Sequence, residues 1–253
     1  MSWNPELYHK YQKERFAPFN DLLELIVLKK GLRVLDLGCG TGELTEMVSE
    51  KLPDSDVLGI DSSSQMLAEA VQKKRIGLNF ELCPIEDITN KWDLVFSNAA
   101  IQWVSDHREL IPKLISLLSP GGQIAIQLPA NHNHPTQTLI TEVANEEPYK
   151  NALNNWQREW SVLSILEYSE LLYKAGAEDI NVFEKVYLHV LDDVDAIVEW
   201  LSGTALIPYF ERLPEEMHAD FLNSYREKLK DLYPEIPVLF PYQRIFFSAR
   251  LHE

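Results

Sequence analysis

One run of nine residues, VLDLGCGTG from Val34 to Gly42, restricts the fold of this chain more than any other feature. Its first part is apolar apart from Asp36 and favours a buried strand, and three closely spaced glycines follow. Such glycines let the backbone turn sharply and let a ligand approach where a Cβ would clash. The helix expected next, from Gly42 to Leu52, would present unpaired N–H groups to a polar part of that ligand. The run therefore predicts a ligand-binding turn between a strand and a helix.

Apolar runs without alternation recur along the chain, as expected for strands covered on both faces. Helical segments lie between them. Strands alternating with helices predict an α/β fold with a mostly parallel sheet and crossover helices on both faces. The predicted strands cover residues 32–37, 57–60, 79–82, 93–96, 123–127, 181–189 and 244–251. The predicted helices between the first five strands cover residues 42–52, 63–74 and 108–118, and Pro120-Gly121-Gly122 is expected to end the last of them.

The overall charge limits the classes of partner. The formal net charge is −16 at pH 7, and such a field repels the phosphates of nucleic acids. No apolar run approaches the roughly 20 residues that span a bilayer, and the N-terminus lacks the apolar core of a signal peptide. The only cysteines, Cys39 and Cys83, cannot form a disulfide framework. We therefore expect a cytoplasmic monomer that acts on a small molecule and binds neither nucleic acid nor membrane.

A carboxylate downstream of the glycine turn indicates which ligand binds. Asp61 stands about twenty residues on, at the end of the second predicted strand, where it can accept hydrogen bonds from both ribose hydroxyls of an adenosine cofactor. A dinucleotide fingerprint needs a third glycine where this chain has Glu43, and Asp36 puts a carboxylate where a pyrophosphate would sit. Asp36 instead suits the cationic amino-acid part of S-adenosylmethionine. The sequence favours that cofactor over a dinucleotide oxidoreductase and over a turn without a ligand.

These residues resemble the class I S-adenosylmethionine-dependent methyltransferases. LDLGCGTG followed by GIDSSSQMLAEA is similar to the first two motifs of that class. The resemblance implies a Rossmann-like, seven-stranded sheet whose last strand is antiparallel. It also implies that Gly38, Gly40 and Gly42 line the methionine moiety, that Asp61 holds the ribose, and that Met66 packs on the adenine. The full set of expected cofactor-binding residues is Asp36, Gly38, Cys39, Gly40, Gly42, Asp61, Ser62, Met66, Ile85, Glu86 and Asn98.

The third motif departs from the pattern of the class. Many relatives have a Gly-Asp pair at the end of the third strand, whose Asp binds the adenine amine, whereas this chain has Cys83-Pro84. Ile85 can still cover the adenine face, and Glu86 or Asp87 can supply the missing acceptor.

A single domain over residues 1–253 is long enough to bury one sizeable core. Its expected parts are an N-terminal helical lid over residues 1–30, interrupted near Pro18, a cofactor-binding core over 31–130, a loop with helices over 131–177, and a helical insertion between the last two strands over 192–233.

A narrower resemblance spans nearly the whole chain. It is similar to the trans-aconitate 2-methyltransferases, which transfer a methyl group to a carboxylate oxygen of a small polycarboxylate. The segments that carry this likeness are WNPELYHKYQKERFAP, FSNAAIQWVSDH, QLPAN, the EW-L…T-L-P pattern from Glu199 to Pro208, and FPYQRIFFSAR. The run from Ser97 to Trp103 is also similar to methyltransferases that esterify a malonyl-carrier protein. We therefore predict a carboxyl O-methyltransferase, with a carrier-protein methyltransferase and a non-catalytic S-adenosylmethionine-binding module as alternatives.

Several positions depart from the narrower family. Its members would offer an Asp before Asn131, a Trp after it, and a His near position 137; here Ala130, His132 and Gln137 stand instead. Ile207 also replaces an Arg expected just before Pro208, which removes one bidentate carboxylate clamp.

The residues expected to contact the acceptor lie where parallel strands end, because ligands of open α/β sheets bind at that edge. If the final strand is antiparallel, Arg244 begins it at this edge and Arg250 ends it at the opposite one. Aromatic residues Trp3, Tyr8 and Tyr11, with Arg15, are candidates for the lid. The full set of expected acceptor-binding residues is Tyr8, Arg15, Gln102, Trp103, His107, Asn131 and Arg244.

We predict no catalytic base and no metal. A carboxylate is already a nucleophile at neutral pH, so its esterification needs positioning and exclusion of water rather than proton transfer. His132 and His134 lie close together in sequence but lack a third ligand, and Cys39 is interpreted as a small residue of the turn.

Overall fold

The computed structural model describes residues 12–252, with side chains from Phe16 onward. The chain folds into two compact units. We call the first the sheet unit; it comprises Phe16–Pro129, Ser161–Lys185 and Arg244–Glu253. The second, the helical unit, comprises Ala130–Trp160 and Val186–Gln243. The single-domain organisation expected from the sequence stays a prediction.

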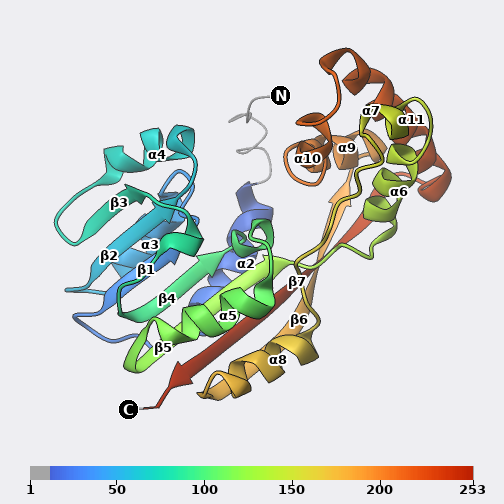
Figure 1. Ribbon diagram of the computed structural model, residues 1–253. Coiled ribbons are helices and arrows are strands. Elements are labelled where there is room, and N and C mark those ends of the chain that lie inside the picture. The colour runs from blue at the N-terminus through green and yellow to red at the C-terminus, as the bar shows by residue number, and fades with distance from the viewer. Residues whose placement is uncertain (1–11, 253) are drawn as a thin grey trace. The chain divides into compact units, whose positions relative to one another are not determined.

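Seven strands form one sheet in the order β3-β2-β1-β4-β5-β7-β6 (Figure 1). They are β1 (Arg33–Leu37), β2 (Asp56–Asp61), β3 (Leu78–Leu82), β4 (Trp92–Asn98), β5 (Leu118–Pro129), β6 (Ala177–Leu191) and β7 (Val238–Leu251). The first five strands pair in parallel, whereas β7 is antiparallel to β5. The predicted α/β fold with an antiparallel last strand is therefore confirmed.

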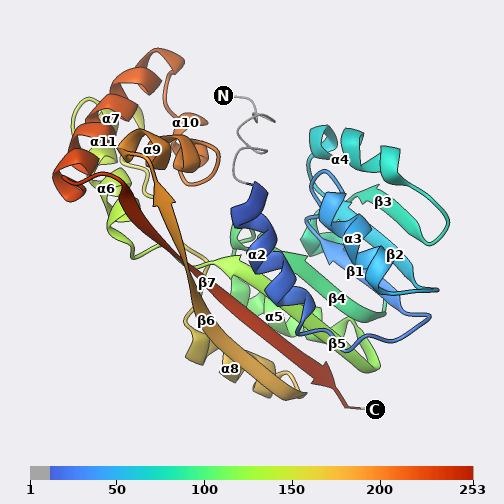
Figure 2. The ribbon, with the colours of Figure 1, turned by 180° about the vertical axis from the view of Figure 1, so that it is seen from behind.

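Helices cover both faces of the sheet within the sheet unit. They are α2 (Gln12–Leu23), α3 (Glu43–Lys51), α4 (Ser64–Ala70), α5 (His107–Ser116) and α8 (Ile165–Lys174). α2 and α3 lie on one face, and α5 and α8 lie on the other (Figures 1 and 2). This arrangement explains why the middle of strands such as β1 and β4 is mostly apolar without alternation, because both faces of these strands are covered.

The predicted interruption at Pro18 is wrong. Pro18 lies inside α2, which continues through it and ends at Leu23, before the end of the helical segment expected over residues 1–30. A proline in a helix interior costs about 3 kcal/mol. Phe19 and Leu22 are fully buried, and the Phe19 ring lies edge-on to that of Phe96 of β4 at 6.0 Å between centroids. Because burying each such side chain contributes about 1.5–3 kcal/mol, packing on the sheet outweighs the local cost.

The Pro-Gly-Gly run also lies elsewhere than expected. α5 ends at Ser116, and the run lies inside β5 as a bulge, where the pairing with β4 passes from Trp92–Leu118 to Leu94–Gln123. A Cβ on Gly122 would lie 2.8 Å from the carbonyl oxygen of Ser119. Glycine therefore permits the bulge instead of marking a simple helix end.

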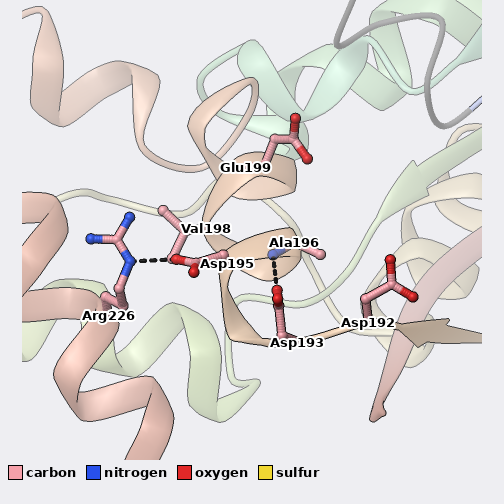
Figure 3. Close-up of a pocket in the computed structure, with 7 residues that line it drawn as sticks. All are labelled: Asp192, Asp193, Asp195, Ala196, Val198, Glu199 and Arg226. Carbon is pink, nitrogen blue, oxygen red and sulfur yellow. Dashed lines mark hydrogen bonds and ion pairs between the residues drawn. The ribbon is translucent and has the colours of Figure 1, made fainter. Parts of the chain in front are cut away.

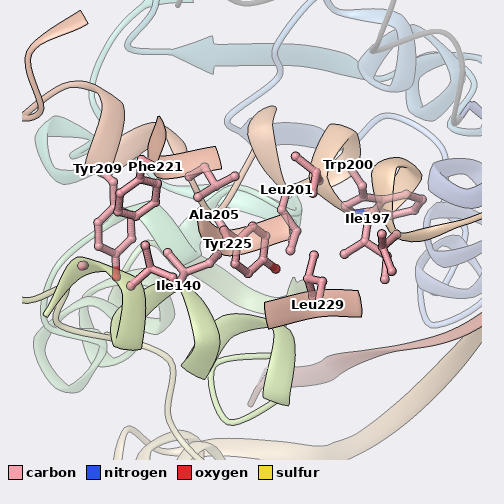
Figure 4. Packing of buried hydrophobic residues seen from close by; sticks show 14 of the residues in the cluster. Ile140, Ile197, Trp200, Leu201, Ala205, Tyr209, Phe221, Tyr225 and Leu229 are labelled. Carbon is pink, nitrogen blue, oxygen red and sulfur yellow. The ribbon is translucent and has the colours of Figure 1, made fainter. Parts of the chain in front are cut away.

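The helical unit has its own hydrophobic core, built from five helices and parts of β6 and β7 (Figure 4). Its helices are α6 (Pro135–Ala144), α7 (Tyr149–Ala152), α9 (Val194–Ser202), α10 (Ile207–Phe210) and α11 (His218–Leu232). The buried Tyr225 hydroxyl donates to the Thr136 carbonyl at 2.9 Å, which joins α11 to α6. The helical block predicted between the last two strands is thus present as separate helices. Among residues 12–252, no helix is both long enough and apolar enough to cross a membrane.

Candidate active site

The glycine turn between β1 and α3 is held by backbone hydrogen bonds. The amides of Gly38 and Cys39 both donate to the Ile60 carbonyl of β2 at 2.8 Å. A Cβ on Gly38 would lie 2.2 Å from the Cβ of Ala100, so close packing requires glycine there. Gly40 has a φ of +56°, and a Cβ built on it would meet no heavy atom within 4 Å. The turn is therefore packed at Gly38 and open at Gly40, where a ligand can approach the backbone.

Asp61 at the end of β2 is fixed beside this turn. One carboxylate oxygen accepts the Gly40 amide at 2.9 Å, and the other accepts the Ser63 amide at 2.8 Å. A carboxylate oxygen has two lone pairs, so each oxygen keeps one for a further donor. The half-buried side chain therefore fits two adjacent hydroxyls, such as those of a ribose.

Asp36 is a buried carboxyl at the base of the turn. It is 3% exposed and accepts the Thr45 hydroxyl of α3 at 2.6 Å. Burial raises the pKa of Asp36 to about 7, although the hydrogen bond from Thr45 lowers it. A cation bound nearby would favour the ionised form and offset part of the free energy that burial of the carboxylate costs. This carboxyl therefore fits the ammonium group of an amino acid and opposes a pyrophosphate.

Cys39 has no features of a nucleophile. Its side chain is buried, and burial raises the pKa of the thiol. Its Cβ lies close enough to Gly59 of β2 that a Cβ on that glycine would be 2.8 Å away. Cys39 therefore serves as a small packed residue of the turn, as the sequence indicates.

The residues expected around the adenine follow β2 and β3. Ser63 caps α4 by accepting the Met66 amide at 3.3 Å; Ser62 is exposed, and Met66 is half-buried. The Cys83 amide donates to the Asp61 carbonyl at 3.0 Å, which brings the end of β3 beside the end of β2. A single 3₁₀ turn, Ile85–Asp87, then carries a half-buried Ile85 and an exposed Glu86.

The antiparallel register places Arg244 as predicted. Arg244 lies opposite Pro129 at the carboxyl end of β5, whereas Arg250 lies opposite Gln123 at the other end. Arg244 is 5% exposed, so it is a buried guanidinium and not an exposed surface group. One of its nitrogens, Nη1, donates to Oε1 of Gln127 at 3.1 Å.

Gln127 also lies at this edge, although it was not among the site residues predicted from the sequence. It is 1% exposed, and its Nε2 donates to Oδ1 of Asn98 at 2.8 Å. The available signal was the run QIAIQLP, in which glutamines occupy two positions of an otherwise apolar strand. A buried amide in such a strand needs partners, which makes it a candidate for a structured polar site.

Two of the predicted acceptor residues lie in the 3₁₀ turn Ile101–Trp103 that follows β4. Gln102 donates through Nε2 to the Ala99 carbonyl at 2.7 Å, and none of the described residues gives a hydrogen bond to its buried Oε1. Trp103 is 51% exposed. Gln102 therefore keeps an acceptor that no described residue uses.

His107, which was expected among the acceptor-binding residues, has both ring nitrogens engaged by the protein. It is 1% exposed; one ring nitrogen contacts the Tyr168 hydroxyl at 2.5 Å, and the other contacts the Ile101 carbonyl at 2.8 Å. Burial lowers the pKa of His107, which favours the neutral ring. Because α8 covers it and both nitrogens are engaged, we leave His107 out of the acceptor site.

Asn131 lies in the helical unit, where its amide exchanges two hydrogen bonds with the backbone of Gln243. Asn131 Nδ2 donates to the Gln243 carbonyl at 3.0 Å, and its Oδ1 accepts the Gln243 amide at 2.9 Å. Tyr8 lies outside the described residues, as do Trp3 and Tyr11, and the side chain of Arg15 is likewise outside them.

A cavity in the helical unit is not a candidate for binding an anion. Its charged lining consists of Asp192, Asp193, Asp195, Glu199 and Arg226 (Figure 3). Asp193 caps α9 by accepting the Ala196 amide at 3.0 Å, and Arg226 pairs with Asp195. Negative charge dominates this lining and would repel a carboxylate.

Comparisons with known proteins agree with this geometry. A family described as a methyltransferase domain matches residues 28–181. Among solved structures, the YcgJ protein of Bacillus subtilis superimposes with a TM-score of 0.62 at 14% identity, covering 94% of this chain and 99% of that one. Phosphoethanolamine N-methyltransferase 2 of Haemonchus contortus, in complex with S-adenosyl-L-methionine, gives a TM-score of 0.55 at 20% identity over 92% of this chain and 53% of that one. The chain is therefore a class I S-adenosylmethionine-dependent methyltransferase, an enzyme whose cofactor is S-adenosylmethionine.

Relatives of higher sequence identity show which family within this class the chain belongs to. Trans-aconitate 2-methyltransferase of Deinococcus radiodurans is 41% identical over 255 residues, covering 98% of both chains. The enzyme of the same name from Escherichia coli is 37% identical over 260 residues, covering 99% of both chains. Within its class the chain belongs to the trans-aconitate 2-methyltransferase family. The alternatives of a dinucleotide oxidoreductase and of a non-catalytic module are thereby set aside.

Proposed function

We propose that this enzyme esterifies one carboxylate of a small polycarboxylic acid of the trans-aconitate kind. The observation that carries the proposal is the buried guanidinium of Arg244 at the carboxyl edge of the sheet. A guanidinium binds a carboxylate through two parallel N–H groups, and a buried position shields such a contact from water. Arg244 would therefore hold a carboxylate of the acceptor. The names of the relatives, which specify trans-aconitate, point to the same class of acceptor.

The cofactor would be held by the residues of the glycine turn and the strand ends beside it. Asp61 would accept from the ribose hydroxyls, Asp36 would face the ammonium group, and the open backbone at Gly40 would lie against the methionine part. Met66 and Ile85 would cover the adenine, with Ser62 and Glu86 at its rim. Bound S-adenosylmethionine supplies an electrophilic methyl group on a sulfonium sulfur.

The reaction requires little of the protein beyond positioning the acceptor oxygen next to the methyl group. An O–CH₃ bond forms as the S–CH₃ bond breaks, and no proton leaves the acceptor because a carboxylate is ionised at neutral pH. The chain therefore needs no general base, and its contribution is to align the acceptor oxygen and to exclude water. Good alignment of this kind supplies about 7–11 kcal/mol of the barrier reduction. Asn98 was expected in the cofactor site; we place it in the acceptor site instead, because it is hydrogen-bonded to Gln127, the partner of Arg244. Gln102 and Trp103 belong with them, and the roles of Asn131, Tyr8 and Arg15 stay predictions.

The direct test is incubation with methyl-labelled cofactor and a panel of acceptors. The panel contains trans-aconitate, other di- and tricarboxylates, a monocarboxylate, the amide of the best acid, and a malonyl-carrier protein. We expect a base-labile labelled ester on a small polycarboxylate, identified by mass spectrometry. Label on the carrier protein alone, or base-stable label on an amine or a neutral hydroxyl, would contradict the proposal. The monomeric state and cytoplasmic location expected from the sequence also stay predictions, and light scattering tests the first.

A further inference from the structure

Three polar side chains form a chain of hydrogen bonds across the strand ends of the sheet unit. Asn98 of β4 lies opposite Gln127 of β5 in the parallel register, and Gln127 lies opposite Phe246 of β7, two residues from Arg244. Directly opposed residues, and residues two apart on a strand, share a face of the sheet. The three side chains therefore lie on one face. Arg244 Nη1 donates to Gln127 Oε1 at 3.1 Å, and Gln127 Nε2 donates to Asn98 Oδ1 at 2.8 Å.

The direction of these bonds follows from the chemistry of the groups. A guanidinium has only donors, so Gln127 must turn its oxygen toward Arg244. The Gln127 NH₂ group then faces Asn98, which must turn its own oxygen toward Gln127. The Asn98 NH₂ group is thereby directed away from Gln127, and no described residue accepts a hydrogen bond from it.

Burial makes this direction hard to reverse. Gln127 is 1% exposed and Arg244 is 5% exposed, so water cannot readily replace either partner. Reversing the Gln127 amide would place two donors against each other at Arg244 and two acceptors against each other at Asn98. Of the three side chains, Asn98 alone is half-buried rather than buried, so it is the most accessible to a ligand at this edge.

We propose that Gln127 is a positioning residue that makes Asn98 an obligatory hydrogen-bond donor in the acceptor site. This inference rests on the proposed function. A guanidinium carries no acceptor, and Asn98 then turns only its NH₂ group outward, so neither side chain presents an acceptor to the ligand. A carboxylate, which only accepts, satisfies both residues, whereas a primary amide or an ammonium group brings donors of its own. The hydrogen-bonded chain of Arg244, Gln127 and Asn98 thus selects an ionised carboxylate over the corresponding neutral amide.

The test compares Gln127→Met with Gln123→Met. Gln127→Met keeps the approximate volume and leaves the charge of Arg244 unchanged, but it frees Asn98 to turn either end of its amide to the ligand. Gln123 lies on the same strand and is also buried, but its amide pairs with the backbone of Val27 at 2.9 Å through both ends. It is therefore a matched control for the loss of a buried amide.

We expect Gln127→Met to raise the KM of the acid about tenfold, the loss expected for one hydrogen bond to a charged group. The inhibition constant of the corresponding amide, measured as a competitor of the acid, should change little or fall, so the preference for the acid over the amide shrinks. The dissociation constant of S-adenosylmethionine should stay within about twofold of that of the parent enzyme. Gln123→Met should lower the melting temperature and leave the acid-to-amide preference unchanged.

Asn98→Asp provides a second test, at a half-buried position where folding is less at risk. Gln127 still donates to one oxygen of the introduced carboxylate, and the outward group becomes an acceptor that repels the substrate. We expect a larger rise in KM for the acid than Gln127→Met causes, with cofactor binding retained. If the parent enzyme esterifies an acid but both variants keep its preference for the acid over the amide, Gln127 has no such role and the function stands. If the parent enzyme esterifies no acid, the proposed function and this inference both fail.

Discussion

The carboxyl of Asp36 and the hydroxyl of Thr45 lie 2.6 Å apart, beneath the turn that carries the glycines. Both side chains are buried, and this hydrogen bond opposes the effect of burial on the carboxyl. The result is a pKa for Asp36 of about 7, against 3.8 for an ordinary aspartate. Without a ligand, the charge of Asp36 therefore changes near neutral pH, in the region that we assign to the ammonium group of the cofactor.

The affinity for S-adenosylmethionine should therefore depend on pH. Below about pH 7 Asp36 is mostly protonated, and binding a cation beside it must release that proton. The association constant should then fall by up to about tenfold for each pH unit below the pKa. Calorimetry in buffers of different ionisation enthalpy checks both the affinity and the proton release. Asp36→Asn should bind more weakly above pH 7 and show a flatter profile; an unchanged profile in that variant would remove Asp36 from the cofactor site.

Protein stability should show the opposite trend. The pKa of Asp36 is raised on folding, so the folded state holds the proton more tightly than the unfolded state. The stabilising contribution is present below about pH 3.8 and is lost as pH rises to about 7. The difference in unfolding free energy between the parent and Asp36→Asn should therefore shift against the parent across this window, by at most about 1.4 kcal/mol per pH unit. Chemical denaturation of both proteins at several pH values measures this difference, and a constant difference would argue against a raised pKa.

Thr45→Val should move the pH dependence of cofactor binding upward. Valine has nearly the shape of threonine but cannot donate, and the Thr45 hydrogen bond is the contact that lowers the pKa of Asp36. The midpoint of the affinity profile should rise in this variant, so binding at pH 7 weakens while binding at pH 9 approaches that of the parent. Equal weakening at both pH values would instead indicate a distorted turn.

The sequence predicted those parts of the site that depend on local backbone chemistry. The glycine turn and Asp61 follow from the patterns at the ends of two predicted strands, and Arg244 follows from the direction of one strand. The errors came from tertiary packing. Pro18 stays helical because Phe19 and Leu22 are buried on the sheet.

Two features of the acceptor edge could not be predicted from local pattern. His107 begins a helix, where histidine is commonly solvated, but α8 covers it and Tyr168 engages its ring. The role of Gln127 depends on the strand register, which places its side chain between those of Asn98 and Arg244. Neither pairing is visible from sequence spacing, because the partners are contributed by distant segments.

Gly40→Ala should block the cofactor, whereas Gly31→Ala should not. Both glycines have positive φ, +56° and +71°, and neither would place a Cβ within 4 Å of another heavy atom. Each substitution therefore costs a similar backbone strain, about 1–2 kcal/mol. Only Gly40 lies beside Asp61, so only its Cβ would occupy space that we assign to the ligand. The two variants should lose similar amounts of stability, but only Gly40→Ala should lose most of its affinity for S-adenosylmethionine. Equal affinities in the two variants would contradict the proposed cofactor position.

Tyr168→Phe should reduce stability without changing the acceptor constants. The change removes the partner of a buried His107 nitrogen, and leaving a buried polar group unsatisfied costs about 1–3 kcal/mol. The ring of Tyr168 stacks on Phe247 at 5.1 Å between centroids, and phenylalanine preserves that contact. Thermal unfolding should show the loss, and the KM for the acid should match that of the parent. A selective rise in KM would return His107 to the acceptor site.

Arg244→Lys should raise the KM for the acid far more than Arg250→Lys does. The two arginines belong to the same strand, but Arg244 lies at the edge where the parallel strands end, and Arg250 lies at the other edge, 3.6 Å from Asp179 in an exposed ion pair. Lysine keeps the charge but cannot form the two parallel hydrogen bonds of a guanidinium, so a bound carboxylate loses about 1.5–3 kcal/mol of contact. That loss corresponds to a rise in KM of about tenfold or more.

An exposed pair contributes about 0–1 kcal/mol, so Arg250→Lys should leave both KM and stability nearly unchanged. Cofactor affinity, measured by calorimetry, should be the same in both variants, because neither arginine reaches the glycine turn in the proposed arrangement. Equal KM values for the two variants would show that the acceptor carboxylate does not depend on the Arg244 guanidinium.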